Sequence, residues 1–374
     1  MSYRYGASYL DPGLNTLVAP TGTYSYGIYA WGLNGNGVLG LNNRTNYSSP
    51  KQIGALTTWL NISSARYHTV ANKTDKTLWV WGRNNNGQLG LGNTTYYSSP
   101  KQVGLLTNWL SIAAGYYTVG AIKTDGTLWT WGSNSRGELG LGNTTPYSSP
   151  KQVGALTNWS SISCGYYNML AIKTDGTLWS WGYGYHGQLG IGNVTNYSSP
   201  KQVGALTNWL KSATTYGGVL ALKTDGTLWA WGDNSQGQLG TGNTTYYSSP
   251  KQIGLLTNWS SISIGRFQSG AVKTDGTLWT WGSNGQGSLG LNNRTYYSSP
   301  KQVGALTNWS NIGSGQLHML ATKTDGTLWS WGYNFSGQLG IGNTTSYSSP
   351  KQVGALTTWG KVAPFENHSF ALII

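Results

Sequence analysis

The sequence predicts an all-β fold, a closed seven-bladed β-propeller whose blades are four-stranded sheets. Three observations predict it: a 50-residue repeat that runs without insertion or deletion through the 374 residues, Asp-Gly hairpin signals within the repeats, and chain ends that are complementary parts of one repeat. Repeats of about this length are typical of solenoids and propellers. Trp-Gly marks the seven repeats, at Trp31, Trp81, Trp131, Trp181, Trp231, Trp281 and Trp331.

Each repeat contains segments that predict four strands. Residues 169–182 (MLAIKTDGTLWSWG) predict two strands joined by Asp175-Gly176, and we take the first of these as the inner strand of the blade. Residues 159–163 (WSSIS) predict the strand before this hairpin, and residues 201–206 (KQVGAL) predict the strand after it. Four strands per repeat are typical of a propeller blade.

The ends of the chain indicate a closed ring. Residues 351–374 cover the first 24 positions of a repeat, and the pattern begins at Ser25 (SYGIYAWG), at position 25 of a repeat. An open solenoid would need polar capping repeats, and none is visible. We therefore expect one propeller over residues 25–374, closed by a blade built from residues 351–374 and 25–50. Residues 1–24 form an N-terminal extension, which either packs on the propeller or acts as a docking arm.

Composition narrows the function. The chain has 55 glycines and 20 tryptophans but only 9% charged residues, which favours turns and packed strands over amphipathic helices. The net charge of +13 would suit nucleic acid, but most lysines recur in the SSPKQ and KTD elements and form rings. We favour a solubilising role for this charge. No standard signal peptide or transmembrane segment is expected, and Cys164 is the single cysteine, which leaves no intramolecular disulfide.

Two repeated elements carry a family resemblance. G-x-x-x-x-x-A-x-K-T-D-G-T-L-W-x-W-G and N-x-x-G-Q-L-G-x-G-N, followed by S-S-P-K-Q-V, recur over residues 25–374. They resemble the regulator of chromosome condensation repeat, and the resemblance implies a seven-bladed propeller closed by mixing the chain ends. Members of that family include a nucleotide exchange factor for a small GTPase, a β-lactamase inhibitor protein, and bacterial and phage proteins. The wedge of the exchange factor has no counterpart in repeats of constant length, so exchange activity is not expected.

No constellation of residues points to catalysis. Six acidic residues occupy hairpin turns, and Asp11, Glu138, Asp233 and Glu366 are scattered, so no carboxylate pair of the glycosidase type is expected. The chain has neither a Walker loop nor a dinucleotide fingerprint. The histidine that the resemblance implies before the inner strand is present only at His68, His318 and His368, on blades too far apart for a shared zinc ion. We predict a protein that is not an enzyme and has no cofactor or metal.

The tryptophans are expected to pack the blades rather than to form a binding platform. Trp79 and Trp81 alternate with Leu78 and Val80, the pattern of a strand that is buried on both faces. Aromatic rings of this size bury a large area and dominate core energetics.

Departures from the repeat are concentrated in short blocks. The first block precedes the inner strand and reads SARYH at residues 64–68, then AGYYT, CGYYN, TTYGG, IGRFQ, SGQLH and PFENH. The second follows Trp-Gly and reads LNGN, RNNN, SNSR, YGYH, DNSQ, SNGQ and YNFS. Because the strands of a hairpin are antiparallel, both blocks lie opposite the Asp-Gly turns, on one face of the disc, the variable face. A smaller block comprises Asn46, Tyr96, Pro146, Asn196, Tyr246, Tyr296 and Ser346.

We interpret the variable face as a binding surface, because Tyr, Trp and Arg dominate interface hot spots and paratopes are rich in Tyr, Ser, Gly and Asn. Neutral drift in exposed loops is the alternative, but it favours small polar residues. The predicted partner-binding residues are Arg66, Tyr67, His68, Arg83, Tyr116, Tyr117, Arg136, Tyr166, Tyr167, Asn168, Tyr183, Tyr185, His186, Tyr216, Asp233, Gln236, Arg266, Phe267, Gln268, Gln286, Gln316, His318, Tyr333, Phe335, Glu366 and His368.

The leading hypothesis is a non-catalytic propeller that binds a protein or a glycan on its variable face. It would serve as a phage or surface-associated recognition or structural component, with residues 1–24 as an anchor in a larger assembly. Three alternatives stay open: a protein inhibitor similar to the β-lactamase inhibitor, a chromatin- or nucleic-acid-binding propeller, and a lectin-like glycan-binding propeller.

Overall fold

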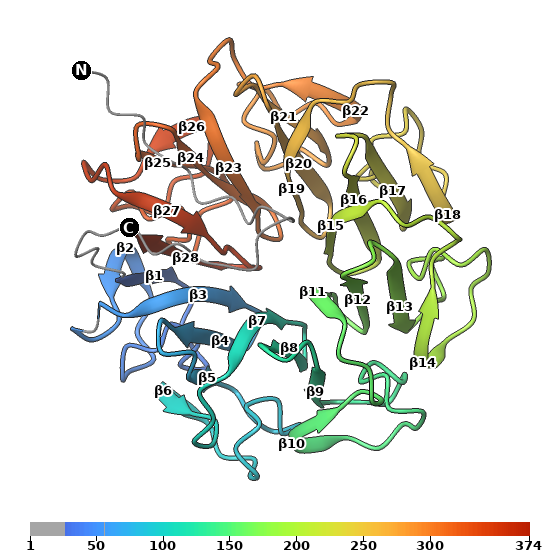
Figure 1. The fold of residues 1–374 in the computed structure, drawn as a ribbon. Coiled ribbons are helices and arrows are strands. Elements are labelled where there is room, and N and C mark those ends of the chain that lie inside the picture. The colour runs from blue at the N-terminus through green and yellow to red at the C-terminus, as the bar shows by residue number, and fades with distance from the viewer. Residues whose placement is uncertain (1–26, 56) are drawn as a thin grey trace, which may run out of the picture.

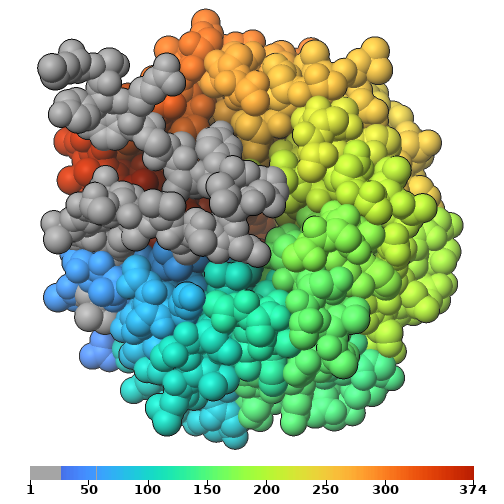
Figure 2. All heavy atoms as spheres, in the orientation of Figure 1, coloured from blue at the N-terminus to red at the C-terminus, as the bar shows by residue number. Residues whose placement is uncertain are grey.

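The computed structural model describes residues 27–55 and 57–374, so the predicted extension, residues 1–24, lies outside the described residues. The chain forms seven four-stranded antiparallel sheets around a central channel (Figure 1). Figure 2 shows the blades as sectors of a disc that follow one another in chain order. The predicted all-β, seven-bladed propeller is confirmed. Within the described ranges, no helix has the length and apolar character needed to span a membrane.

Every blade has the same strand order from the channel outward. The innermost strands are β3 (Trp59–Ser64), β7 (Trp109–Ala114), β11 (Trp159–Cys164), β15 (Trp209–Thr214), β19 (Trp259–Ile264), β23 (Trp309–Ser314) and β27 (Trp359–Val362). The second strands are β4 (His68–Lys73), β8 (Thr118–Lys123), β12 (Asn168–Lys173), β16 (Gly218–Lys223), β20 (Gln268–Lys273), β24 (His318–Lys323) and β28 (His368–Ile373). The third strands are β1 (Ile28–Gly32), β5 (Leu78–Gly82), β9 (Leu128–Gly132), β13 (Leu178–Gly182), β17 (Leu228–Gly232), β21 (Leu278–Gly282) and β25 (Leu328–Gly332). The outermost strands are β2 (Tyr47–Gln52), β6 (Tyr97–Gln102), β10 (Tyr147–Gln152), β14 (Tyr197–Gln202), β18 (Tyr247–Gln252), β22 (Tyr297–Gln302) and β26 (Tyr347–Gln352).

Two details of the blade differ from the prediction. The strand before the hairpin, such as β11, lines the channel, and the predicted inner strand, such as β12, is second. The fourth strand is β14, which ends at Gln202, so the predicted strand 201–206 begins too late. Pro200 lies in β14 without disrupting the sheet because the outer edge of the blade needs no N–H donor there.

The two ends of the chain share the closing blade, as predicted. Its sheet has the order β2-β1-β28-β27, so the N-terminal segment supplies the two outer strands and the C-terminal segment the two inner ones. Strands β1 and β28 are antiparallel, with Ala30 opposite Phe370. The closing blade extends from β27 to β28 and from β1 to β2, rather than from residue 351 to residue 50, because β26 belongs to the preceding blade.

Buried indoles fix each blade to the preceding one. Trp131 Nε1 donates a hydrogen bond of 3.1 Å to the carbonyl of Gln88, and Trp31 Nε1 donates one of 2.9 Å to the carbonyl of Gln338, which closes the ring. A Cβ atom on Gly90 would lie 2.6 Å from Trp131 Nε1, and its φ is +70°, so this close approach requires glycine. The interpretation of the tryptophans as blade packing agrees with the complete burial of Trp81 and its copies. Trp79 and its copies, which were also predicted to be buried, are only half-buried.

The two faces of the disc differ in their loops. One face, the invariant face, carries the hairpin turns and the loops that join successive blades, and Thr174 N donates to the carbonyl of Asn158 between the two. In the turn, Asp175 Oδ1 accepts hydrogen bonds from Thr177 N at 2.9 Å and Thr177 Oγ1 at 2.7 Å. The other face carries the two long variable blocks.

Candidate partner-binding face

Backbone hydrogen bonds join the variable blocks of each blade. Tyr183 N donates to the carbonyl of Tyr167 at 2.8 Å, and the equivalent bonds recur in the other blades. The smaller block joins the same face, since Gly184 N donates to Asn196 Oδ1 at 2.9 Å. The predicted pairing of the two long blocks is therefore present. The third block, for which the sequence predicts no position, accepts a hydrogen bond from the second block.

Tyrosines from four neighbouring blades form a continuous aromatic arc on this face. Tyr116 stacks on Tyr166 with ring centroids 3.4 Å apart, and Tyr166 meets Tyr216 edge to face at 4.9 Å. The arc extends outward from Tyr167 to Tyr183, 6.3 Å away. Its members are Tyr67, Tyr116, Tyr117, Tyr166, Tyr167, Tyr183, Tyr185, His186, Tyr216 and Tyr246. Tyr246 was not among the predicted residues, although its place in the smaller variable block could have indicated it.

Arginines lie against the rings of the arc. The guanidinium carbon of Arg83 is 4.7 Å from the centroid of Tyr67, that of Arg136 is 5.5 Å from Tyr183, and that of Arg266 is 4.5 Å from Tyr216. Cation–π contact holds a guanidinium flat while leaving some of its N–H groups free to donate. The arc therefore combines rigid aromatic area with positive charge.

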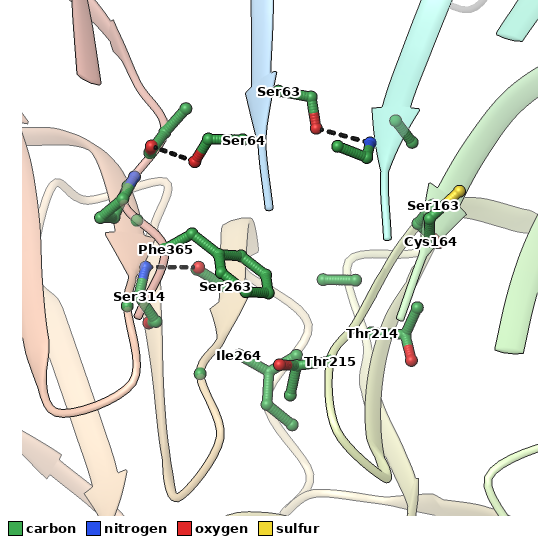
Figure 3. Close-up of a pocket in the computed structure, with 18 of the residues that line it drawn as sticks. Ser63, Ser64, Ser163, Cys164, Thr214, Thr215, Ser263, Ile264, Ser314 and Phe365 are labelled. Carbon is green, nitrogen blue, oxygen red and sulfur yellow. Dashed lines mark hydrogen bonds between the residues drawn. The ribbon is translucent and has the colours of Figure 1, made fainter. Parts of the chain in front are cut away.

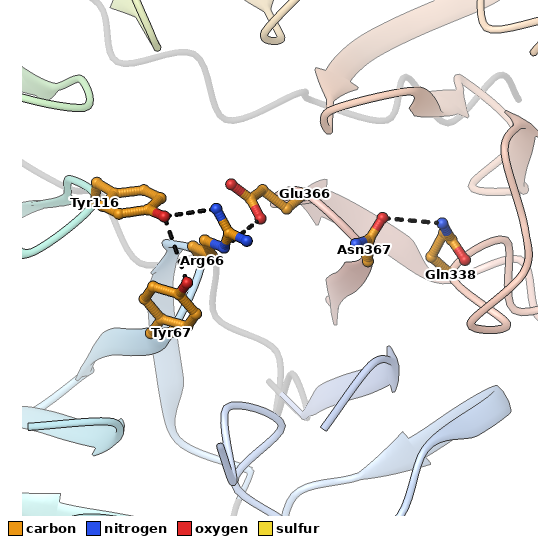
Figure 4. Close-up of polar contacts among 6 residues, drawn as sticks. All are labelled: Arg66, Tyr67, Tyr116, Gln338, Glu366 and Asn367. Carbon is orange, nitrogen blue, oxygen red and sulfur yellow. Dashed lines mark hydrogen bonds and ion pairs between the residues drawn. The ribbon is translucent and has the colours of Figure 1, made fainter. Parts of the chain in front are cut away.

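Arg66 is the one arginine in the described ranges that forms an ion pair. Its Nε lies 2.9 Å from Glu366 Oε2, and its Nη1 donates a hydrogen bond of 2.5 Å to the hydroxyl of Tyr116 (Figure 4). Burial is the main influence on Glu366 and raises the pKa of its carboxyl, although Arg66 and Arg266 oppose this effect. Since Arg66 precedes β4 and Glu366 precedes β28, the pair links the first complete blade to the closing blade.

The central channel opens within this face. It has a volume of about 430 Å³, and Tyr166, Tyr216, Arg266 and Glu366 line it together with residues of the innermost strands. Figure 3 shows the side chain of Phe365 pointing into the channel. Serine hydroxyls bridge neighbouring strands, as where Ser263 Oγ accepts a hydrogen bond of 2.8 Å from Ser314 N. The face is thus a ring of aromatic and cationic loops around a central hollow.

Seven predicted contact residues are buried, so the proposed binding surface excludes their side chains. Five belong to the second strands and point between the blades, where for example Gln268 Nε2 donates to the carbonyl of Gly315 and His318 Nε2 lies 2.9 Å from Ser369 Oγ. Tyr116 is enclosed by its aromatic neighbours, and Asp233 Oδ1 accepts a hydrogen bond from Ser235 N within its own loop. The seven are His68, Tyr116, Asn168, Asp233, Gln268, His318 and His368.

The other predicted residues are half-buried or exposed. Tyr185 and Phe335 are the most prominent, with 67% and 71% of their surface exposed. Tyr333 and Phe335 form a separate aromatic pair at 4.8 Å, on a different blade from the arc. Phe267 lies 4.8 Å from the guanidinium of Arg266. The half-buried glutamines Gln236, Gln286 and Gln316 belong to the variable blocks of three successive blades.

Burial favours the neutral forms of three histidines and of the single cysteine. Burial lowers the pKa of His68 to about 4 and those of His318 and His368 to about 3, so these imidazoles are neutral at physiological pH. Burial raises the pKa of the Cys164 thiol, which disfavours the reactive thiolate. Among the described residues, no group of three or more His, Cys, Asp or Glu side chains could hold a metal ion.

A model of the regulator of chromosome condensation (RCC1) repeat matches seven times, at residues 27–71, 75–122, 125–172, 175–222, 225–272, 275–322 and 325–372. The chain belongs to this family. A second model of the same repeat matches residues 61–88, 109–138, 159–188 and 309–338. Most family repeats start at a third strand and end with the second strand of the next blade, so each repeat spans the junction between two blades.

Solved structures with the same fold share about a fifth of their residues with this RCC1-repeat propeller. Prp20p from Saccharomyces cerevisiae, characterised for binding to Gsp1p and histones, is 20% identical over 94% of this chain and 92% of its own, with a TM-score of 0.84. Yeast RCC1 (Prp20) bound to Kap60 is 20% identical over 94% and 89%, with a TM-score of 0.85. Human WBSCR16 is 21% identical over 93% and 98%, with a TM-score of 0.82. Among curated proteins, none matches this chain in sequence.

Proposed function

We propose that this RCC1-repeat protein is a non-catalytic binding propeller whose variable face captures another protein. The observation that carries the proposal is the aromatic arc with its stacked arginines, which offers rigid apolar area and oriented donors on one surface. Such residues supply most of the binding energy in protein interfaces. Prp20p, which binds Gsp1p and histones, and yeast RCC1, which binds Kap60, support a protein as the partner class.

The charge of the face favours a partner with acidic side chains. Of the arginines beside the arc, only Arg66 pairs with a carboxylate within the described residues. Arg83, Arg136 and Arg266 lie over aromatic rings instead and can donate to carboxylates of a partner. A phage or surface-associated setting stays a prediction, because it depends on the partner rather than on the geometry of the face.

A pull-down from a nuclease-treated extract of the source organism tests the proposal. One variant combines Tyr167→Ala, Tyr183→Ala, Tyr185→Ala and Arg136→Ala. The matched control combines Leu105→Ser and Leu255→Ser on the invariant face, where both leucines are 92% exposed. We expect wild type and control to retain the same proteins and the variant to lose them, with all three chains melting at similar temperatures. Retention of the same proteins by the folded variant would contradict the proposal.

A further inference from the structure

A second kind of site lies between the blades on the invariant side of the disc, away from the aromatic arc. A pocket of about 470 Å³ is bounded by the end of one blade and the start of the next. Its walls include Gln102, Leu106, Lys123, Trp129 and Ser149. This volume falls within the range of small-molecule sites, roughly 300–1,000 Å³.

The pocket holds a cation that makes no direct ion pair among the described residues. Lys123 is only 7% exposed, and its Nζ lies 3.7 Å from the centroid of Trp129 and 4.9 Å from that of Trp109. Its nearest acid, Asp125, accepts hydrogen bonds from Thr127 N at 3.0 Å and Thr127 Oγ1 at 2.6 Å. Within residues 27–55 and 57–374, no carboxylate lies at ion-pair distance from Lys123. Burial, the larger influence, lowers the pKa of Lys123, whereas Asp125 acts on the ammonium through its charge alone and raises it. Because buried charges in proteins are usually paired directly, the ammonium is suited to a direct bond with an external anion.

The aromatic wall of the pocket is fixed in place. Trp129 is half-buried, and its Nε1 donates a hydrogen bond of 2.9 Å to Thr127 Oγ1, which in turn donates to Asp125. The KTDGTLW segment thus orients both the ammonium and the indole of the pocket. One further polar atom of the pocket lining, Trp109 Nε1, is buried without a hydrogen-bond partner among the described residues. The site is preorganised, which reduces the entropy lost on binding.

The same arrangement is built six times around the disc. In every copy, a lysine Nζ lies 3.7–3.9 Å from the centroid of one tryptophan and 4.9–5.2 Å from that of another. The closing blade breaks the series, because Ile373 and Tyr29 occupy the positions of the lysine and the half-buried tryptophan. The lysines are Lys73, Lys123, Lys173, Lys223, Lys273 and Lys323.

We propose that each of these six lysine–tryptophan sites binds one carboxylate-bearing sugar unit of an acidic polysaccharide. The lysine ammonium, which lies over the half-buried indole, pairs with the carboxylate, and the exposed part of that indole contacts the apolar C–H face of the pyranose ring. The side chains of Gln102 and Ser149, or their equivalents, hydrogen-bond the ring hydroxyls. A polymer with a repeating acidic unit suits this architecture because six identical sites on one disc raise avidity far above the affinity of each.

Calorimetric titration with trigalacturonate, a trimer of galacturonic acid, tests the proposal on the full chain. We expect about six bound trimers per chain, together with quenching of tryptophan fluorescence. The fully methyl-esterified trimer keeps the sugar rings but lacks the negative charges, so it should bind at least about tenfold more weakly. Absence of trigalacturonate binding, a stoichiometry of one, or equal affinity for acid and ester would overturn the proposal.

Two variants assign the binding to the pockets. Lys123→Met keeps an unbranched chain over the indoles and removes one ammonium, so the stoichiometry should fall from six to five without loss of the fold. Tyr29→Trp combined with Ile373→Lys should create a seventh site. An unchanged stoichiometry in either folded variant would place the ligand elsewhere. The Tyr167, Tyr183, Tyr185 and Arg136 variant should bind trigalacturonate like wild type, which separates this site from the variable face.

Discussion

The guanidinium of Arg66 and the carboxylate of Glu366 meet where the ring closes, with Nε and Oε2 2.9 Å apart. The two residues are 300 positions apart in the sequence but belong to neighbouring blades. The exposed fractions of their side chains are 37% and 11%, so the carboxylate is the more desolvated partner. Removing the arginine should therefore change the free energy of unfolding by a different amount from removing the glutamate.

We expect Arg66→Met to destabilise the fold by about 1–2 kcal/mol, because it leaves a mostly buried carboxylate without its cation. Glu366→Gln should change the free energy of unfolding by no more than about 0.5 kcal/mol at neutral pH, since burial already opposes ionisation of this carboxyl. Urea unfolding at pH 7 measures both effects. Arg83→Met is the matched control, because Arg83 stacks on Tyr67 without a carboxylate partner in the described chain. Equal losses for Arg66→Met and Glu366→Gln would contradict the asymmetry.

The buried histidines should make the fold sensitive to mild acid. An unfolded histidine titrates near 6.5, whereas His68 titrates at about 4 and His318 and His368 at about 3 in the folded chain. As pH falls below about 6.5, the unfolded chain gains protons that the folded chain does not. Each histidine therefore lowers the free energy of unfolding by up to about 1.4 kcal/mol per pH unit.

Replacing the histidines with residues that other blades carry at the same position tests this effect. The variant His68→Thr, His318→Gln, His368→Gln follows Thr118 and Gln268. Urea midpoints at pH 7.0, 5.5 and 4.5 should fall more steeply for wild type than for the variant. Measurements stay above about pH 4.5 because the turn aspartates, whose pKa values are lowered, titrate below that range. Parallel curves for the two chains would refute this role of the histidines.

The repeat and the complementary ends were enough to predict the ring, because blade number and closure follow from periodicity. The strand nearest the axis was not predictable from the hairpin signal, which is local and carries no information about distance from the axis. The segment YSSPKQ was missed as the fourth strand because Pro is unfavourable in central strands, whereas β14 and its equivalents are edges.

The sequence predicted which loops form the variable face, but not which of their side chains are exposed. Antiparallel pairing placed the blocks that contain Tyr167 and Tyr183 together, as their backbone hydrogen bond shows. Successive side chains on a strand point to opposite faces, so variation at His68 or Gln268 reflects packing between blades rather than contact with a partner. The inter-blade pocket is not among the predicted sites because its residues are identical in most repeats, whereas the predicted site residues lie where the repeats differ.

Replacing a glycine that faces a buried indole should destabilise the fold more than replacing a glycine with a similar positive φ angle in an open loop. A Cβ on Gly140 would lie 2.7 Å from Trp181 Nε1, whereas a Cβ on Gly154 would meet nothing within 4 Å. Their φ angles are +71° and +59°, so alanine at either position costs about 1–2 kcal/mol of backbone strain. Gly140→Ala should lose about 1–3 kcal/mol more through overpacking. Thermal unfolding of the two variants provides the comparison, and equal melting temperatures would refute the packing argument.

A single neutralising change at Glu138 should stabilise the protein at neutral pH. Glu138 is fully buried, and its carboxylate accepts hydrogen bonds from Arg136 N at 2.6 Å and Ser133 Oγ at 3.1 Å. In an equivalent loop, the neutral Gln188 accepts the same backbone bond, from His186 N at 2.8 Å. Glu138→Gln therefore keeps the loop bond, and the Ser133 hydroxyl can turn to accept from the new amide.

Burial raises the pKa of Glu138, so the folded chain holds this proton more tightly than the unfolded chain. The stability of wild type consequently falls as pH rises through that pKa, whereas a glutamine at this position is insensitive to pH. Glu138→Gln should match wild type near pH 4 and exceed it by about 1 kcal/mol at pH 7 in urea unfolding. The reverse change, Gln188→Glu, should destabilise the chain at pH 7. A Glu138→Gln chain that is less stable than wild type at pH 7 would show that the carboxylate bonds outweigh the cost of burying the charge.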